Sequence, residues 1–393
     1  MEYKPLGSMV NRKIGYGIVQ PGQSVPDGVP VIKVNNLISG LKSPSELDTT
    51  ARENEAKYSR TRLHGGELIV SVVGTIGKTA IVPKSFAGCN LVRATALIDI
   101  EDELMSKWVK YYFDSPCGQS YIEQNLNTTV QPTLNIKSLV EMPIPIRDTT
   151  EMEKTVLLLS ALDEKIEVNR QINDNLEQQA HSYFQELFVD NASPEWTTGT
   201  ISDLGTVVGG STPSKAKPEY YTESGIAWIT PKDLSINKSK FISHGENDIT
   251  ELGLKNSSAA IMPEGTVLFS SRAPIGYIAI AAGEVTTNQG FKSVVPKPEI
   301  GTPFVYFFLK NTLPVIEGMA SGSTFKEVSG STMKNVPAVI PDAEILAKFS
   351  DFCAPIFAQQ RTLEEQNQSL AKLRDSLLPK LMSGEIDVSA VHL

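Results

Sequence analysis

The chain alternates between two patterns of apolar residues. Over residues 1–149, and again over 192–341, short apolar runs are interrupted by glycine and proline, which is typical of strands joined by tight turns. Over 150–191 and 342–393, apolar residues recur at alternating spacings of three and four, which predicts long helices with a heptad seam. We therefore expect the order globular domain, long helix, globular domain, long helix, with the first boundary at Asn191-Ala192-Ser193-Pro194.

The second half repeats the pattern of the first half. Residues 28–40 read GVPVIKVNNLISG and residues 225–237 read GIAWITPKDLSIN. The aromatic runs WVKYYF (108–113) and FVYFFL (304–309) each precede a segment rich in serine and threonine and then a proline-flanked strand. The offset of about 197 residues is too long for a solenoid, whose periods are roughly 20–50 residues, so it indicates a duplicated domain.

The stretch SVVGTIGKTAIV at 71–82 raises the possibility of a phosphate-binding loop. That motif needs a glycine five residues before Gly77, and the residue there is Val72. The repeat partner SSRAPIGYIAIA at 270–281 keeps the Ile-Gly pair and the following apolar run but replaces Lys78 with Tyr277. The shared feature is strand, glycine-containing turn and strand, which predicts a hairpin rather than a nucleotide site.

The two helical segments are expected to pair with each other in antiparallel fashion, through a seam that one small domain is too short to cover. At 1.5 Å per residue the seam is roughly 45–50 Å long. Polar residues in each seam, Asn169 and Asn173 in one and Gln359 and Gln366 in the other, are expected to fix the register. The alternative is that each helix packs on its own domain. The predicted helix-pairing residues are Leu159, Leu162, Ile166, Asn169, Leu176, Leu187, Phe352, Ile356, Leu363, Leu370, Leu373 and Leu377.

Composition excludes several classes of protein. No apolar stretch approaches the roughly 18–20 residues that span a bilayer, and three dispersed cysteines favour a reducing cytoplasm. Four scattered histidines give no metal-ligand spacing, and we find no catalytic constellation and no Gly-rich methyltransferase loop. The net charge of −9 argues against nucleic acid, but much of the acidity falls within 151–190, so a DNA-binding surface elsewhere remains compatible with it.

Four segments together resemble the specificity (S) subunits of type I restriction-modification enzymes over nearly the whole chain. They are LLPKLMSGEIDV (377–388), LDEKIEVNRQINDNLEQQAHSYFQELF (162–188), PEWTTGTISDLG (194–205) and TNQGFKSVV (287–295). The chain departs from many relatives in starting almost directly at YKPLG, without a longer leader.

The resemblance implies an α+β fold with two pseudo-symmetric target-recognition domains, mostly β with a few helices, separated by two long antiparallel coiled-coil helices. Each domain would read one half of a bipartite site on double-stranded DNA. Because loops such as KYSRTRLHGG (57–66) and ITELGLKNSSAA (249–260) differ between the repeats, we expect that site to be asymmetric. The subunit itself would be non-catalytic and hold no cofactor or metal. Its partners would be two methyltransferase (M) subunits with S-adenosylmethionine and, in the full complex, two restriction (R) subunits with ATP and Mg. No membrane association is expected.

DNA contacts are expected from basic residues and from amide or hydroxyl side chains in the loops that differ between the repeats. In the first domain the candidates are Lys57, Arg60, Arg62, Lys78, Asn90, Arg93, Thr128, Thr129 and Gln131. In the second they are Lys215, Lys217, Tyr220, Lys232, Arg272, Asn288, Gln289, Lys292, Ser323, Thr324 and Lys326. The alternative for each is a solvated surface residue, and for the tyrosine a core residue. M-subunit contacts are expected from polar residues of the helices: Asp163, Lys165, Glu167, Asn169, Arg170, Arg361, Glu364, Glu365, Lys372 and Arg374. For the chain as a whole, the alternative is a coiled-coil scaffold that binds protein.

Overall fold

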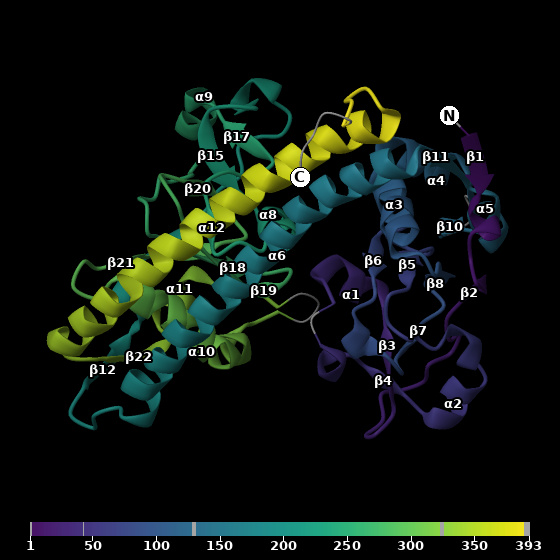
Figure 1. The fold of residues 1–393 in the computed structure, drawn as a ribbon. Coiled ribbons are helices and arrows are strands. Elements are labelled where there is room, and N and C mark those ends of the chain that lie inside the picture. Colours follow the sequence, from purple (N-terminus) through teal and green to yellow (C-terminus); the bar gives the residue numbers. More distant parts are fainter. Residues whose placement is uncertain (1, 42, 128–130, 323–325, 389–393) are drawn as a thin grey trace. The chain divides into compact units, whose positions relative to one another are not determined.

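The computed structural model describes residues 2–41, 43–127, 131–322 and 326–388. The chain divides into two compact units: Met1–Lys165 with Leu370–Leu393, and Ile166–Ser369. The two long helices are α6 (Thr149–Gln185), which continues as a π-helix over Glu186–Asp190, and α12 (Ala343–Ser383) (Figure 1). Because the division falls within both helices, each unit contains one globular part and a segment of each long helix.

The first unit is built around two small sheets. One has the strand order β2-β8-β5-β6 and the other β4-β3-β7. Two further antiparallel pairs are β1 with β11 and β9 with β10. The strands are β1 (Glu2–Pro5), β2 (Arg12–Tyr16), β3 (Val29–Ile32), β4 (Thr49–Thr50), β5 (Leu68–Ser71), β6 (Thr79–Ile81), β7 (Asn90–Leu91), β8 (Thr95–Asp99), β9 (Leu126–Asn127), β10 (Thr133–Leu134) and β11 (Pro143–Ile146). The shorter helices are α1 (Val34–Ser39), α2 (Arg52–Ala56), α3 (Glu103–Asp114), α4 (Pro116–Gln124) and α5 (Ile136–Glu141).

The second unit has sheets in the order β13-β21-β18-β19-β16 and β14-β17-β15-β20, with the separate pair β12 and β22. The strands are β12 (Thr197–Thr200), β13 (Gly205–Gly209), β14 (Tyr221–Thr222), β15 (Ile226–Ile229), β16 (Phe241–Ile242), β17 (Asn247–Ile249), β18 (Val267–Ser271), β19 (Ile275–Ala281), β20 (Thr286–Thr287), β21 (Lys292–Pro296) and β22 (Pro337–Ile340). The shorter helices are α7 (Ile201–Leu204), α8 (Pro231–Ile236), α9 (Glu251–Lys255), α10 (Thr302–Met319) and α11 (Gly330–Lys334).

The two units share a strand topology. The order β2-β8-β5-β6 in the first unit recurs as β13-β21-β18-β19 in the second. A parallel pair, β3 with β7, recurs as β15 with β20. The outer antiparallel pair β1/β11 likewise recurs as β12/β22. The duplication expected from the sequence is therefore confirmed at the level of topology.

The stretch 71–82 is a hairpin, as its repeat partner predicts. Strand β5 pairs with β6, with Val70 opposite Thr79. The backbone N–H of Gly77 donates to the Ser71 carbonyl at 2.9 Å, and that of Lys78 donates to Ser71 Oγ at 2.8 Å. Gly77 has a φ of 80°, a conformation that glycine adopts without a steric penalty. The N–H groups of Gly77 and Lys78 thus bond within the hairpin and are not available to a phosphate.

Each long helix packs both on a globular part and on the other long helix. In the first unit, Leu159 of α6 and Leu378 and Leu381 of α12 join the core that contains Trp108. In the second unit, the core that contains Phe307 includes Phe184 of α6 together with Phe349 and Cys353 of α12. The sequence left two alternatives open: the long helices pair with each other, or each packs on a globular domain. Both kinds of contact are present.

The helices run antiparallel along their contact. Asn169 Nδ2 donates to Asn367 Oδ1 at 2.9 Å, and Gln360 Nε2 donates to the carbonyl of Asn173 at 3.2 Å. Further along α6, the Tyr183 ring lies 4.5 Å from the ring of Phe352. Position numbers rise along α6 as they fall along α12, so the antiparallel arrangement is confirmed.

The seam on α12 is displaced by one residue from part of the sequence prediction. Its less exposed positions include Cys353, Gln360 and Asn367, which are spaced by heptads; Cys353 and Gln360 are buried and Asn367 is partly buried. The positions before them are more open: Phe352 is 39% exposed, although it contacts Tyr183, and Gln359 and Gln366 are exposed. Asn169 Nδ2 also donates to Gln366 Oε1 at 3.5 Å, so Gln366 contacts α6 as predicted although it is exposed.

The other predicted helix-pairing residues occupy different environments. Leu373 is 47% exposed, so we no longer place it in the seam. Six of the remaining residues are buried: Leu159, Ile166, Asn169, Leu187, Ile356 and Leu363. Four are partly buried: Leu162, Leu176, Leu370 and Leu377.

Candidate nucleic-acid interface

Three loops of the first unit are joined by backbone hydrogen bonds next to the 71–82 hairpin. The loops are the hairpin turn 72–78, the turn 92–95 after β7, and the segment 131–134. Val72 N–H donates to the Ala94 carbonyl at 2.8 Å, and Leu134 N–H donates to the Val72 carbonyl at 2.9 Å. The turn and the segment are therefore held against the hairpin.

The second unit contains the same arrangement. Ser271 N–H donates to the Gly290 carbonyl at 2.7 Å, and Val328 N–H donates to the Ser271 carbonyl at 2.9 Å. These bonds join residues 271–277, 288–292 and 326–328. We call the two sets of loops the three-loop clusters, one in each unit.

The repeated bonds show which positions correspond between the units. Val92 N–H donates to the Ile32 carbonyl just after the parallel pair β3/β7. Asn288 N–H donates to the Ile229 carbonyl just after the parallel pair β15/β20. Val92 thus corresponds to Asn288, and Arg93 corresponds to Gln289. Asn90, which the sequence alone pairs with Asn288, instead corresponds to Thr286, and both of these residues are fully buried.

Three of the predicted first-domain residues lie on the first three-loop cluster. Lys78, Arg93 and Gln131 are all exposed. In the part of the chain that the structure describes, the side chains of Lys78 and Arg93 form no hydrogen bond or ion pair. Thr128 and Thr129 lie outside the described residues. An exposed cation without an internal partner is suited to a phosphate or a base edge.

The second cluster concentrates charge around an acid that the sequence reading missed. Glu327 lies 3.6 Å from Arg272 and 3.9 Å from Lys292. Burial lowers the pKa of Lys292, Glu327 acts in the opposite direction and Arg272 lowers it further. Sequence patterns give no signal for Glu327, because its role comes from the bridge that its backbone forms with Arg272.

Amide side chains complete the second cluster. Gln289 is exposed and hydrogen-bonds to Thr212, whereas Asn288 Oδ1 accepts from Gly290 N–H at 2.8 Å and shapes the turn. Lys326 is exposed. Ser323 and Thr324 lie outside the described residues.

The remaining basic candidates of the first unit come from another segment. Lys57, Arg60 and Arg62 follow α2 and are exposed, but they are not part of the backbone network of the three-loop cluster. Arg62 binds both carboxylate oxygens of Glu55. This contact raises the pKa of Arg62 and lowers that of Glu55. Arg62 is therefore less available for DNA than Lys57 or Arg60.

The other second-unit candidates also divide by their contacts. Lys215 is exposed on the loop after β13. Ser211, in the same loop, donates its N–H to the Thr287 carbonyl at 2.9 Å. Lys217 Nζ donates to Tyr220 OH at 3.1 Å, and Tyr220 is only 5% exposed, so the tyrosine is a core residue. Lys232 forms an exposed ion pair with Glu246 at 2.5 Å.

Asn90 is a structural residue rather than a DNA contact. It is fully buried, its Oδ1 accepts from Thr61 Oγ1 at 2.8 Å, and its Nδ2 donates to Glu55 Oε1 at 3.0 Å and to the Tyr58 carbonyl at 3.1 Å. Its amide therefore has no capacity left for a base. We remove it from the candidate interface.

Replacing Asn90 with alanine is expected to lower the free energy of unfolding by about 1–3 kcal/mol, because it leaves buried polar partners unsatisfied. Urea denaturation measures the change. The matched variant is Arg93→Ala, which removes an exposed side chain and should stay within about 0.5 kcal/mol of wild type. Equal losses in the two variants would contradict the structural role of Asn90.

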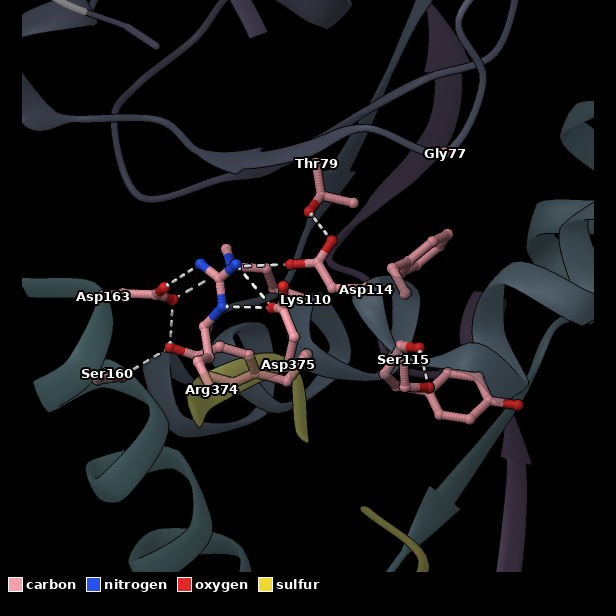
Figure 2. A network of polar contacts seen from close by, with 12 residues as sticks. Gly77, Thr79, Lys110, Asp114, Ser115, Ser160, Asp163, Arg374 and Asp375 are labelled. Carbon is pink, nitrogen blue, oxygen red and sulfur yellow. Dashed lines mark hydrogen bonds and ion pairs between the residues drawn. The ribbon is translucent and has the colours of Figure 1, made fainter. Parts of the chain in front are cut away.

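A polar network lies behind the first three-loop cluster (Figure 2). Thr79, at the end of the hairpin turn, donates to Asp114 of α3 at 2.7 Å, and Lys110 Nζ lies 2.9 Å from Asp114. Lys110 Nζ also lies 3.6 Å from Asp163 of α6, which accepts from Arg374 of α12 at 2.7 Å. Burial acts to raise the pKa of Asp163, but Lys110 and Arg374 outweigh it and hold that pKa below its ordinary value.

The described residues give no sign of metal or membrane chemistry. Among them, no group of three or more histidine, cysteine, aspartate or glutamate side chains could hold a metal ion. None of the helices in the described part of the chain is long and apolar enough to cross a bilayer.

Comparison with known proteins places both halves in one family. The model of the type I restriction modification DNA specificity domain matches residues 2–178 and 194–371. The MjaIX specificity subunit of Methanocaldococcus jannaschii is 38% identical over 192 residues, which cover 48% of this chain and 44% of that protein. This chain thus spans less than half the length of that relative.

Two further similarities extend over more of the chain. The HindI specificity subunit of Haemophilus influenzae is 24% identical over 65% of this chain and 71% of that protein. The crystal structure of a type I restriction-modification S subunit from M. genitalium has a TM-score of 0.56 at 18% identity, covering 96% of this chain and 95% of that chain, which supports the fold. With two matching domains over most of its length, the chain belongs to the type I restriction-modification DNA specificity family, whose members are the non-catalytic specificity subunits of these enzymes.

Proposed function

We propose that this chain reads a bipartite DNA sequence, with one half-site for each three-loop cluster. The observation that carries the proposal is the repeated backbone network with different side chains at corresponding positions. Arg93 corresponds to Gln289 and Lys78 corresponds to Tyr277. Arginine and glutamine recognise different base edges in the major groove, so the two half-sites should differ and the whole site should be asymmetric.

In this proposal, residues 1–149 and 192–341 are the DNA-reading domains, and residues 150–191 and 342–393 are the helices that connect them. The contacts to DNA are proposed for Lys78, Arg93 and Gln131 in the first domain and for Arg272, Gln289, Lys292 and Lys326 in the second. The exposed side chains of Lys57, Arg60 and Lys215 are proposed to contact phosphates, because they carry charge outside the clusters.

The proposed partners are two M subunits with S-adenosylmethionine and, in the full complex, two R subunits with ATP and Mg. The helices offer a surface for the M subunits. Five of the predicted residues are committed to contacts within the chain, so they are less suited to a partner: Asp163, Asn169, Arg361, Glu364 and Arg374. The exposed charges that remain are those of Lys165, Glu167, Arg170, Glu365 and Lys372.

The test is a genome-wide methylation map. This chain is co-expressed with the methyltransferase subunit encoded beside it, in a host that lacks adenine methylation. We expect one asymmetric two-part motif that appears only when both chains are present. A stable complex of the two chains without new methylation would contradict DNA reading and favour the protein-binding scaffold.

A further inference from the structure

In the first unit, a charged side chain holds a helix segment that the second half of the chain contributes. Arg374 of α12 donates to Asp163 Oδ1 at 2.7 Å (Figure 2). The second oxygen of Asp163 accepts from Tyr111 OH at 2.9 Å. The neighbouring α3 residue Asp114 adds a second acid, which Lys110 contacts at 2.9 Å. Lys110 Nζ also lies 3.6 Å from Asp163, so the place where the first half receives an arginine holds two carboxylates and one lysine and is acidic overall.

The second unit has a junction of the opposite sign. Here the first half contributes Glu177 of α6, whose carboxylate lies 2.5 Å from Lys240 and 2.5 Å from Lys310. Tyr306 OH also donates to Glu177 at 3.2 Å. The Lys240 side chain is only 6% exposed, whereas those of Glu177 and Lys310 are 23% and 39% exposed, so the junction is shielded from water mainly at Lys240. Glu364 of α12 accepts from the backbone N–H groups of Lys240 and Phe241, so the place where the second half receives a glutamate holds two lysines and one carboxylate and is basic overall.

The residues of the two junctions occupy corresponding positions of the repeat. An offset of about 197 residues, the length of the duplicated unit, aligns Glu177 with Arg374. Alignment of WVKYYFD at 108–114 with FVYFFLK at 304–310 places Asp114 opposite Lys310. The contributed residue is acidic in the first half (Glu177) and basic in the second (Arg374). The aligned receiving residue is likewise Asp114 in the first half and Lys310 in the second.

We propose that these two junctions form a charge code that pairs the first half of the chain only with the second half. If two first halves paired, Glu177 would enter a site where Asp163 and Asp114 outnumber Lys110. If two second halves paired, Arg374 would meet Lys240 and Lys310. Partly buried like charges are strongly unfavourable, and repulsion of this kind is how interfaces reject wrong partners. The code is independent of the DNA sequence that each half reads.

The test uses the whole chain, folded and then cut between its halves. The linker residues Asn191, Ala192 and Pro194 are exposed, so a protease site inserted there can be cleaved after folding. Two preparations with different mass tags are mixed in dilute urea to allow exchange, and native mass spectrometry counts the pairs. We expect pairs of unlike halves to exceed pairs of like halves by at least about tenfold.

The decisive variant reverses both contributed charges, Glu177→Arg with Arg374→Glu. The first half would then contribute an arginine that suits Asp163 and Asp114 of another first half. The second half would contribute a glutamate that suits Lys240 and Lys310 of another second half. We expect the cleaved double variant to form pairs of like halves in excess. The uncut double variant should form dimers or larger assemblies in light scattering.

The matched control is Glu164→Arg with Lys372→Glu, which makes the same charge changes at exposed positions on the same helices. It should keep the wild-type preference for unlike halves. The proposal is overturned if the Glu177/Arg374 double variant also keeps that preference, or if the wild-type halves pair at random. Failure of the chain to methylate DNA would leave this result unaffected, because the readout is pairing alone.

Discussion

Replacing Lys240 with alanine is expected to lower the free energy of unfolding by about 3–5 kcal/mol, the range for breaking a buried ion pair from one side. Lys240 Nζ binds Glu177 at 2.5 Å and Gln360 Oε1 at 2.6 Å, and it lies 3.9 Å from the centre of the Phe357 ring. One ammonium group therefore connects a globular domain to both long helices. Burial lowers its pKa, although Glu177 opposes that shift.

Urea denaturation followed by tryptophan fluorescence measures the loss. Lys240→Met retains an apolar side chain of similar length, so its deficit reports on the missing charge rather than on lost packing. Lys334→Ala removes an exposed lysine from the same unit and should change stability by no more than about 0.5 kcal/mol. A loss for Lys240→Ala as small as that of Lys334→Ala would show that the ion pair adds nothing to the unit.

Replacing Arg93 with alanine is expected to reduce methylation of the recognised sequence by roughly 10- to 100-fold, with the loss of base preference confined to one half-site. The corresponding change, Gln289→Ala, should relax the other half-site only. The reason is that the two residues occupy the same position of the two repeats and are both exposed, while each belongs to a separate three-loop cluster. Methylation maps of the co-expressed variants measure both effects.

Arg93→Ala and Gln289→Ala serve as controls for each other, because each should leave unchanged the half-site that the other relaxes. Arg52→Ala removes another exposed arginine of the first unit and should leave the map intact. Loss of preference in both half-sites after a single substitution would contradict the assignment of one half-site to each cluster. A uniform fall in methylation without a change of motif would identify Arg93 as a phosphate contact instead.

The fold was largely predictable because the chain is duplicated, so each segment can be compared with the aligned segment of the other half. The substitution of Tyr277 for Lys78 within a shared strand-turn-strand pattern separates a hairpin from a phosphate loop, and the structure confirms the hairpin. The alternation of spacings predicts both long helices. In such segments the heptad pattern is long enough that single exceptions do not hide it.

The seam of α12 could not be placed fully, because hydrophobicity is a poor guide where a helix buries polar side chains. Phe352 and Leu373 look like seam residues, yet Cys353 and Arg374 are the more buried neighbours. Their positions are favoured by partners on other elements, such as Asp163 for Arg374. The spacing of apolar residues along a helix cannot predict a polar partner on another element.

The candidate interface was predictable by residue type but not by position. Arg93, Gln289 and Arg272 are predicted DNA contacts because basic and amide residues stand in loops that differ between the repeats, and all three lie on the three-loop clusters. Asn90 was wrongly included because an asparagine after a strand looks the same whether its amide faces solvent or three buried partners. Glu327 was missed because its two cations come from other segments of the chain.

The division of the chain into two units also bears on synthesis by the ribosome. The first unit needs Leu378, Leu381 and Met382 of α12 to complete its core, but these residues are translated roughly 200 residues after the rest of that unit. At about 5–20 residues per second, the nascent first domain waits about 10–40 s with part of its apolar surface uncovered. During that interval the early α6 helix also lacks its antiparallel partner. Nascent chains of this protein should therefore depend on chaperones until the last helix emerges.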